Sequence, residues 1–163
     1  MNSVISRNDD GRYCLSEPVT SDIIINLARN IVAEAFERPD KLNSPTDTRN
    51  FLIMQLALEQ SEVFGVVFLD RQHQVIAFER MFFGTIDSAT VHPREVVKRC
   101  LELNAAVVIL THNHPSGVPE PSPADIAITK RLVNALGLVD IKILDHIVVG
   151  GAETVSFAER GLI

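Results

Sequence analysis

A chain of 163 residues, 46% of them hydrophobic and 22% charged, is long enough for one buried core and too short for two ordinary domains. The formal net charge of −6 weighs against tight, non-specific nucleic-acid binding, because such binding draws its affinity from neutralised phosphates. The apolar runs are short, which argues against a membrane span and a signal peptide. The two cysteines, Cys14 and Cys100, are too far apart in sequence to suggest a disulfide framework. We therefore expect a cytoplasmic protein.

The first elements expected are an arm and two helices. Residues 1–19 form a mobile arm around the short apolar segment Tyr13–Leu15, which can pair as an edge strand. From Ser21 onward apolar residues recur at helical spacing, and Pro39 closes this first helix. Ser44-Pro45 is typical of an N-cap followed by the first helical position, and predicts a second helix with a mixed face.

A sheet is expected to begin with a hairpin. Residues 62–70 and 74–83 are rich in β-forming residues and are separated by a short polar segment. In the second of these strands, the period of two places Glu79 in apolar company, where a carboxylate needs a partner. Its plain structural interpretation is a strand-end ion pair with Arg80 or a lysine in solvent. After Gly84, the segment to Val91 adds a short strand.

Helices and strands then alternate to the C-terminus. His92-Pro93 starts a helix that leads into a buried strand at Ala105, and a helix follows at residues 123–137. Residues 138–149 alternate as a strand. This alternation places Ile143, Ile147 and other apolar residues on one face together with Asp145, and His146 on the other face. Strands alternating with helices indicate an α/β sandwich.

The apolar run Ala105–Leu110 ends in two histidines, His112 and His114, and a rigid loop. An uninterrupted β-branched run is typical of a strand buried on both faces, and ligands collect at the carboxyl end of such a strand. Residues i and i+2 point to one side, so both imidazoles face the same space. Ser122 as an N-cap puts Asp125 in the first turn of the next helix, pointing back to the loop. Three such ligands, with a fourth position left to water, are typical of a catalytic zinc site.

Each part of this pattern has a simpler interpretation. A His-x-His pair is common in loops that bind no metal, and Ser122-x-x-Asp125 is a capping box that needs no active site. The capping box is compatible with a ligand role, because it would position the Asp125 carboxylate. Order, spacing and location together favour the metal. Asp145, on an apolar face, is either a core feature or a hydrogen-bond partner of a ligand, and His146 stays unassigned.

These residues resemble a known family. His112-x-His114-Pro115, then Ser122-x-x-Asp125, with Glu79 on an upstream strand, is similar to the JAMM motif of the JAB/MPN+ zinc metalloprotease fold. The likeness sharpens to the RadC-like (UPF0758) branch. It covers roughly residues 43–163 and is carried, in order, by Val63–Asp70, Phe83–Thr85, His92–Val96, His112–Gly117 and Leu144–Ile147.

The resemblance implies a fold and a site. The fold is a mixed β-sheet flanked by helices, a three-layer sandwich like those of JAB/MPN and cytidine-deaminase domains. It divides the chain into an N-terminal arm and helix, residues 1–42, and one globular domain, residues 43–163. The site implied is a zinc ion held by His112, His114 and Asp125, with Glu79 as the base for metal-bound water and Ser122 as a hydrogen-bond donor to the developing oxyanion.

The activity implied is peptidase or isopeptidase-type hydrolysis of an amide bond in a protein or peptide. One alternative is a non-catalytic protein-interaction module of the same fold. Another is a metal-dependent DNA-processing protein, since Asp145-His146 resembles the start of an HNH nuclease site, although too few residues follow to complete one. Longer members of the family carry an N-terminal helix-hairpin-helix region, for which we find no match in this sequence.

Overall fold

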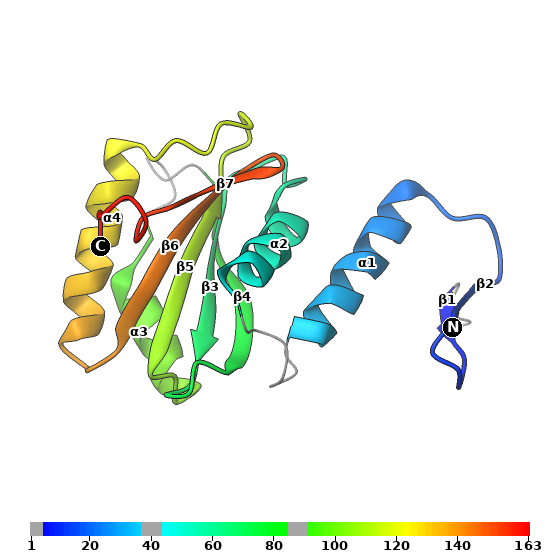
Figure 1. Cartoon of the computed structure of the whole chain (residues 1–163), viewed down its shortest axis with the longest axis horizontal. Coiled ribbons are helices and arrows are strands. Elements are labelled where there is room, and N and C mark those ends of the chain that lie inside the picture. The colour runs from blue at the N-terminus through cyan, green and yellow to red at the C-terminus, as the bar shows by residue number, and fades with distance from the viewer. Residues whose placement is uncertain (1–4, 37–43, 85–90) are drawn as a thin grey trace.

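A five-stranded mixed sheet forms the centre of the computed structural model, which describes residues 5–36, 44–84 and 91–163 (Figure 1). The strand order is β4-β3-β5-β6-β7. The strands are β3 (Val63–Leu69), β4 (Val75–Phe83), β5 (Val107–Asn113), β6 (Lys142–Gly150) and β7 (Glu153–Ser156). Only β5 and β6 run parallel, and the other neighbours are antiparallel. The expected mixed sheet is therefore confirmed.

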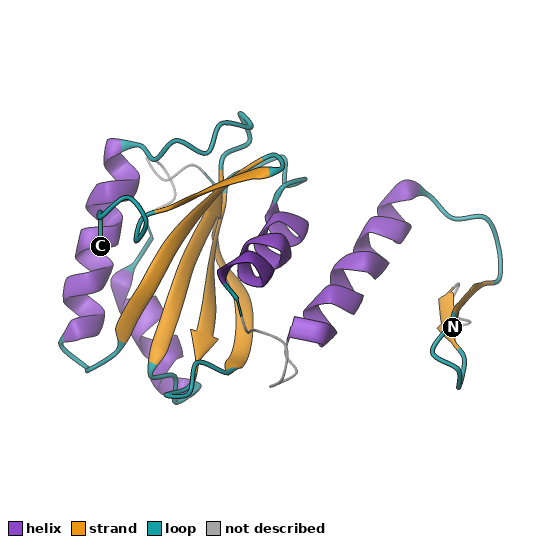
Figure 2. Ribbon diagram, in the orientation of Figure 1, coloured by secondary structure: helices purple, strands orange, loops and turns teal. Residues whose placement is uncertain are grey.

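Helices cover both faces of this sheet (Figure 2). On one face, α3 (Pro93–Glu102) and α4 (Pro123–Gly137) pack over apolar side chains of β3 and β5, including Phe64, Val108 and Leu110. On the other face, α2 (Pro45–Leu56) packs over a second core cluster that includes Val67 and Ile109. Every residue of β3 and β5 is buried, as the unbroken apolar runs predict for strands covered on both faces. The α/β sandwich is confirmed.

The strand β6 contains a bulge that changes which residues share a face. Ile143 pairs with Val108, but the next pair in register is Asp145 with Ile109, so Leu144 is an extra residue. The predicted single face for residues 138–149 is therefore wrong, because a bulge shifts the alternation of side chains by one. Ile143 packs under α3 and α4, whereas the residues beyond the bulge switch faces.

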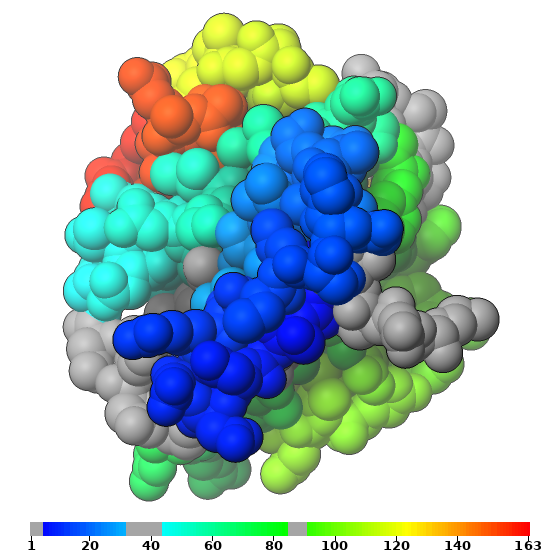
Figure 3. Space-filling view, turned by 90° about the vertical axis from the view of Figure 1, so that its right-hand side faces the viewer, coloured from blue at the N-terminus to red at the C-terminus, as the bar shows by residue number. Residues whose placement is uncertain are grey.

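The N-terminal part lies outside the central sheet. β1 (Ile5–Arg7) and β2 (Tyr13–Leu15) pair with each other, so Tyr13–Leu15 does form a strand, in a two-stranded sheet separate from the central one. α1 (Ser21–Phe36) contacts α2 through Arg29, whose Nε donates to the Met54 carbonyl (3.2 Å). None of the side chains from Ser21 to Ile31 is buried. Figure 3 shows this blue segment on the side of the molecule turned to the viewer. The division at residues 42 and 43 stays a prediction.

Local signals in the sequence mark the starts of three helices. Ser44 caps α2, where its Oγ accepts from the Asp47 N–H (3.2 Å), and Pro residues occupy the first turns of α2, α3 and α4. The strand β7 was not expected, and the strand expected after Gly84 falls on residues 85–90, outside the described part. Among the described residues, no helix has the length and apolar character needed to cross a membrane.

Candidate metal centre

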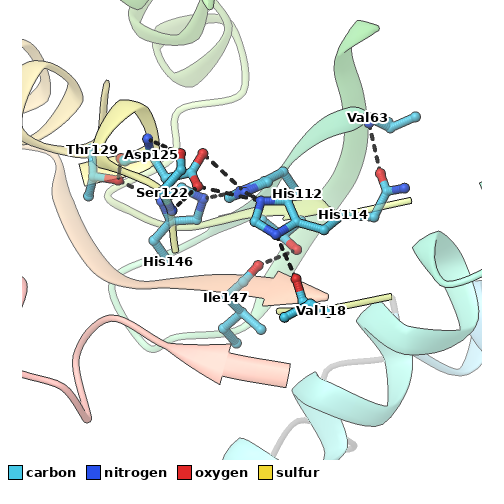
Figure 4. A network of polar contacts seen from close by, with 11 residues as sticks. Val63, His112, His114, Val118, Ser122, Asp125, Thr129, His146 and Ile147 are labelled. Atoms are coloured by element: carbon cyan, nitrogen blue, oxygen red, sulfur yellow. Dashed lines mark hydrogen bonds and ion pairs between the residues drawn. The ribbon is translucent and has the colours of Figure 1, made fainter. Parts of the chain in front are cut away.

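The two histidines at the end of β5 face the same side of the sheet (Figure 4). His112 lies within the strand and is fully buried, and His114 follows it with a side chain that is 18% exposed. The backbone N–H of His114 donates to the Val149 carbonyl (2.8 Å), which extends the β5–β6 pairing past the end of β5. The Nε2 atoms of the two rings are 3.0 Å apart. The i, i+2 spacing has thus brought the two imidazoles together.

Asp125 reaches the histidines from the first turn of α4. Ser122 is the N-cap and forms a capping box: its Oγ accepts from the Asp125 N–H (3.2 Å), and its own N–H donates to Asp125 Oδ2 (2.6 Å). Asp125 Oδ1 lies 3.2 Å from His112 Nε2, and Oδ2 lies 3.4 Å from His114 Nε2. Burial would raise the pKa of Asp125, but its contact with His112 and the hydrogen bonds from Ser122 hold the pKa below its usual range.

Glu62 is a fourth member of the group and was missed from the sequence. It directly precedes β3, which runs antiparallel to β5 with Phe64 opposite His112. Continuing that register places Glu62 opposite His114, on the same face. Glu62, His112, His114 and Asp125 each offer one ligand atom, and these atoms all lie within 4.8 Å of one another.

Hydrogen bonds outside the group orient both rings. His114 Nδ1 is 2.8 Å from the carbonyl oxygen of Val118, which can only accept, so Nδ1 carries the proton and Nε2 offers a lone pair toward the group. His112 Nδ1 is 2.8 Å from Nε2 of His146, a fully buried residue of β6. Burial, and also the neighbouring His112, lower the pKa of His146 well below its ordinary value. His146 therefore belongs to the surroundings of the site, although the sequence left it unassigned.

The group fits a divalent metal ion. Two imidazole nitrogens and the oxygens of one buried and one half-buried carboxylate converge on a small space, and imidazole and carboxylate are ligands of zinc and other transition metals. A buried carboxylate is costly unless it is paired or coordinates a metal. The donor set is therefore chemically suited to an ion, although it does not by itself select one metal.

Glu79, expected as the base, lies outside this group of four residues, and its contacts do not support that role. It lies in β4 opposite Val66, which in turn pairs with Leu110, two residues before His112. Both of its carboxylate oxygens are 2.9 Å from Nε of Arg99 in α3. This half-exposed ion pair is close to the plain interpretation of a strand glutamate, with a helical arginine as its partner.

Ser122 has a structural role that leaves a second one open. Its Oγ accepts from the Asp125 N–H within the capping box, which does not use the hydroxyl proton as a donor. The loop before Ser122 is held against β6 at Gly150, where a Cβ would lie 2.5 Å from the Pro119 nitrogen and 2.8 Å from the Gly117 carbonyl. A glycine is needed there because the loop backbone, which includes the Val118 carbonyl bound to His114, approaches too closely for a side chain.

Asp145 is not a partner of the ligands. It lies beyond the bulge on the opposite face of the sheet, opposite Ile109. Its Oδ1 accepts from the N–H groups of His146 (2.7 Å) and Ala158 (2.9 Å), and Oδ2 accepts from Ser156 Oγ (2.6 Å). It is therefore the core feature among the two interpretations left open, and it organises the chain after β7.

Comparison with known proteins agrees with the family resemblance seen in the sequence. Residues 42–162 match the family model described as RadC-like JAB domain. The chain is 60% identical over 139 residues to a UPF0758 protein of Pseudoalteromonas atlantica, covering 85% of this chain and 62% of the relative. It is 58% identical over 140 residues to one of Thioalkalivibrio sulfidiphilus (86% and 62%) and 55% identical over 139 residues to one of Marinobacter nauticus (85% and 62%). The chain thus spans less than two thirds of the length of these curated relatives.

Proposed function

Since the chain belongs to the RadC-like JAB domain family, we propose that it is a metal-dependent hydrolase that cleaves an amide bond, as a JAMM-type peptidase or isopeptidase does. The observation that carries this proposal is the convergence of Glu62, His112, His114 and Asp125, whose ligand atoms lie within 4.8 Å of one another at the carboxyl end of β5. Ligand sites collect at such strand ends in α/β folds.

We propose zinc as the metal and His112, His114 and Asp125 as its ligands. Three protein ligands of the nitrogen and oxygen type, with one position left for water or substrate, are typical of catalytic zinc sites. Bound zinc supplies Lewis-acid polarisation of a carbonyl and lowers the pKa of water to about 7. The choice of these three rests on their mutual distances: Asp125 has one oxygen near each histidine, 3.2 Å from His112 and 3.4 Å from His114.

Glu62 takes the role of general base that the sequence interpretation gave to Glu79. It is half-buried, and its ligand atom lies within 4.8 Å of those of the other three residues, so a water molecule at the ion would be within its reach. Glu62 would accept a proton from the attacking water and deliver it to the departing amine, which is the usual double role of a carboxylate in amide hydrolysis. Ser122 would donate a hydrogen bond from its hydroxyl group to the carbonyl oxygen as negative charge develops there.

The substrate class we propose is a protein or peptide. The net charge of −6 does not favour a polyanionic substrate held by its phosphates. A non-catalytic interaction module and a DNA-processing protein are the alternatives, and the Asp145-His146 pair gives no support to a nuclease site, because the two side chains lie on opposite faces of the sheet.

Two measurements test the proposal. Elemental analysis of protein purified without added metal should find one zinc per chain in the wild type and none in His114→Ala. A peptide and isopeptide library, with detection of new amino termini, should then show that Glu62→Gln keeps the zinc but hydrolyses about 10²–10⁴-fold more slowly, the usual range for a general base. Glu79→Gln is the matched control, because it removes the same charge from the neighbouring strand and should keep both zinc and activity.

Three outcomes would contradict the proposal. Loss of zinc from Glu62→Gln as readily as from His114→Ala would make Glu62 a ligand rather than a base. Loss of activity in zinc-loaded Glu79→Gln would return the base role to Glu79. A zinc-loaded wild type that cleaves nothing in the library would favour the interaction module.

A further inference from the structure

A chain of buried hydrogen bonds leads away from the candidate metal centre into the core. His112 Nδ1 is 2.8 Å from His146 Nε2, and His146 Nδ1 is 2.6 Å from Thr129 Oγ1. Thr129 Oγ1 is also 2.6 Å from the carbonyl oxygen of Asp125, one helical turn earlier in α4. His112 and His146 are 0% exposed, and Thr129 is 1% exposed. This series of hydrogen bonds thus starts at one candidate ligand, His112, and ends at the backbone of another, Asp125.

The direction of each hydrogen bond in this series follows from the last group in it, the Asp125 carbonyl. The Asp125 carbonyl can only accept, so the hydroxyl proton of Thr129 is used there, and Thr129 Oγ1 must accept from His146 Nδ1–H. A neutral His146 then has a lone pair on Nε2 and accepts from His112 Nδ1–H. A neutral His112 then has an unprotonated Nε2, which faces Asp125 Oδ1 at 3.2 Å and His114 Nε2 at 3.0 Å.

A neutral His146 agrees with its surroundings. Its ring stacks on Phe157 (centroids 4.7 Å apart) and meets the edge of Phe64 (5.6 Å). The atoms that its two nitrogens contact are a hydroxyl oxygen and another imidazole nitrogen, with no carboxylate oxygen among them. A buried imidazolium would need an anionic partner, so the neutral ring is the form that this pocket accommodates.

Packing alone does not account for this arrangement. An apolar side chain would fill the space between Phe64 and Phe157 without the cost of burying two ring nitrogens. The β6 bulge is also what turns His146 onto the face of His112, since it shifts the alternation after Ile143. A metal-binding histidine typically donates its second N–H to an acceptor, which fixes its tautomer and ring orientation. In most such sites the acceptor is a carboxylate, a backbone carbonyl or water, whereas here it is an imidazole backed by a hydroxyl.

We propose that His146 and Thr129 are positioning residues that hold His112 in the tautomer whose Nε2 binds the metal. This rests on the proposed metal site, to which it adds two residues from β6 and α4. The same series of hydrogen bonds joins β5, which carries the histidines, to the turn of α4 that carries Asp125. Ligands from two elements are thereby held in register through the core.

The first test is zinc affinity, measured by competition with a chelator. His146→Leu should bind Zn²⁺ about 10–100-fold more weakly than wild type, the usual cost of losing such a partner. His146→Gln should recover part of the loss, because its amide oxygen can accept from His112 and its amide nitrogen can donate to Thr129. Leu136→Ala is the matched control. Leu136 is a buried core residue of α4 that takes no part in these hydrogen bonds, so the substitution should reduce stability and leave zinc affinity unchanged.

The second test needs no metal. The ¹⁵N resonances of the imidazole nitrogens in metal-free wild type should show the proton of His112 on Nδ1, and Thr129→Val and His146→Leu should shift its population toward Nε2. Wild-type protein with the His112 proton on Nε2 would overturn the proposal, whether or not every variant folds. A folded His146→Leu with wild-type zinc affinity would also overturn it. If wild type binds no zinc at all, the proposed function fails, and the tautomer measurement still decides the positioning role.

Discussion

Both faces of the sheet carry buried or half-buried polar residues on β5 and β6, and the hydrogen-bonding needs of these residues are met in different ways. On the α2 face, Asn113 accepts from the Val63 N–H (2.8 Å) and donates to the Ser61 carbonyl (3.1 Å). Thr111 donates to the Ile147 carbonyl (2.8 Å), and Asp145 accepts from a hydroxyl and two backbone N–H groups. Each donor on this face meets an acceptor, so the groups complete the backbone of the sheet.

On the α4 face, acceptors meet acceptors. With the protons of His112 and His114 on Nδ1, their Nε2 lone pairs lie 3.0 Å apart and face the two oxygens of Asp125. In these neutral tautomers the ring protons point away from Asp125, so a bound cation would be the complement of the facing lone pairs and carboxylate oxygens. A buried polar residue in this fold is therefore structural where donors face acceptors. Where acceptors face other acceptors, the arrangement indicates a site for a ligand. The following predictions test that difference.

The largest loss of stability should come from the complementary side. Asn113→Ala removes the partner of the buried Val63 N–H and two donors to carbonyls, and each buried unsatisfied group costs about 1–3 kcal/mol, so the free energy of unfolding should fall by about 3 kcal/mol. Denaturant unfolding of the metal-free protein measures it. Asn134→Ala, at an exposed position of α4, is the control and should stay within about 0.5 kcal/mol of wild type. Equal effects would remove the distinction.

Metal removal should have the next largest effect. Zinc present at 100 times its dissociation constant stabilises the folded state by about 2.7 kcal/mol, and a chelator should remove that amount from wild type. The protein should stay folded, because the two core clusters do not depend on the ion. Thermal unfolding of wild type and His114→Ala, each with and without chelator, checks this, and only wild type should respond. Complete unfolding in chelator would indicate a structural site instead.

The two serine N-caps should separate the stability of a helix from the chemistry of the site. Ser122→Ala and Ser44→Ala each remove one side-chain acceptor at a helix start, so each should lower the free energy of unfolding by about 1 kcal/mol. Only Ser122→Ala should also slow amide hydrolysis, because only Ser122 adjoins the ligand group. Equal activity of the two variants would remove Ser122 from the mechanism.

The smallest effect should be that of removing a ligand from metal-free protein. His114→Ala loses the hydrogen bond to the Val118 carbonyl but also removes a lone pair that faces other acceptors. These contributions are each of the order of 1 kcal/mol and opposite in sign, so the free energy of unfolding should change by less than about 0.5 kcal/mol. Denaturant unfolding in chelator measures it. A loss as large as that of Asn113→Ala would mean that His114 is structural.

The strongest parts of the sequence interpretation are those that depend on neighbouring residues. The predicted bounds of α4 are those of the structure, because Ser122 and Pro123 mark its start within one turn. His112 and His114 lie on one side because alternation in a strand is a local property, and the same cap that starts α4 turns Asp125 toward them. These three residues could be nominated without knowing how the strands pair.

The tertiary structure decided what depends on pairing between distant segments. Glu62 directly precedes one apolar strand and Glu79 lies within the next. Only the antiparallel register of β3 with β5 shows that Glu62 lies beside His114, while Glu79 forms an ion pair with Arg99 of α3. The bulge in β6 likewise turns His146 to the site and Asp145 away from it. Strand register and bulges are set by contacts far apart along the chain, so the spacing of residues within one strand does not contain them.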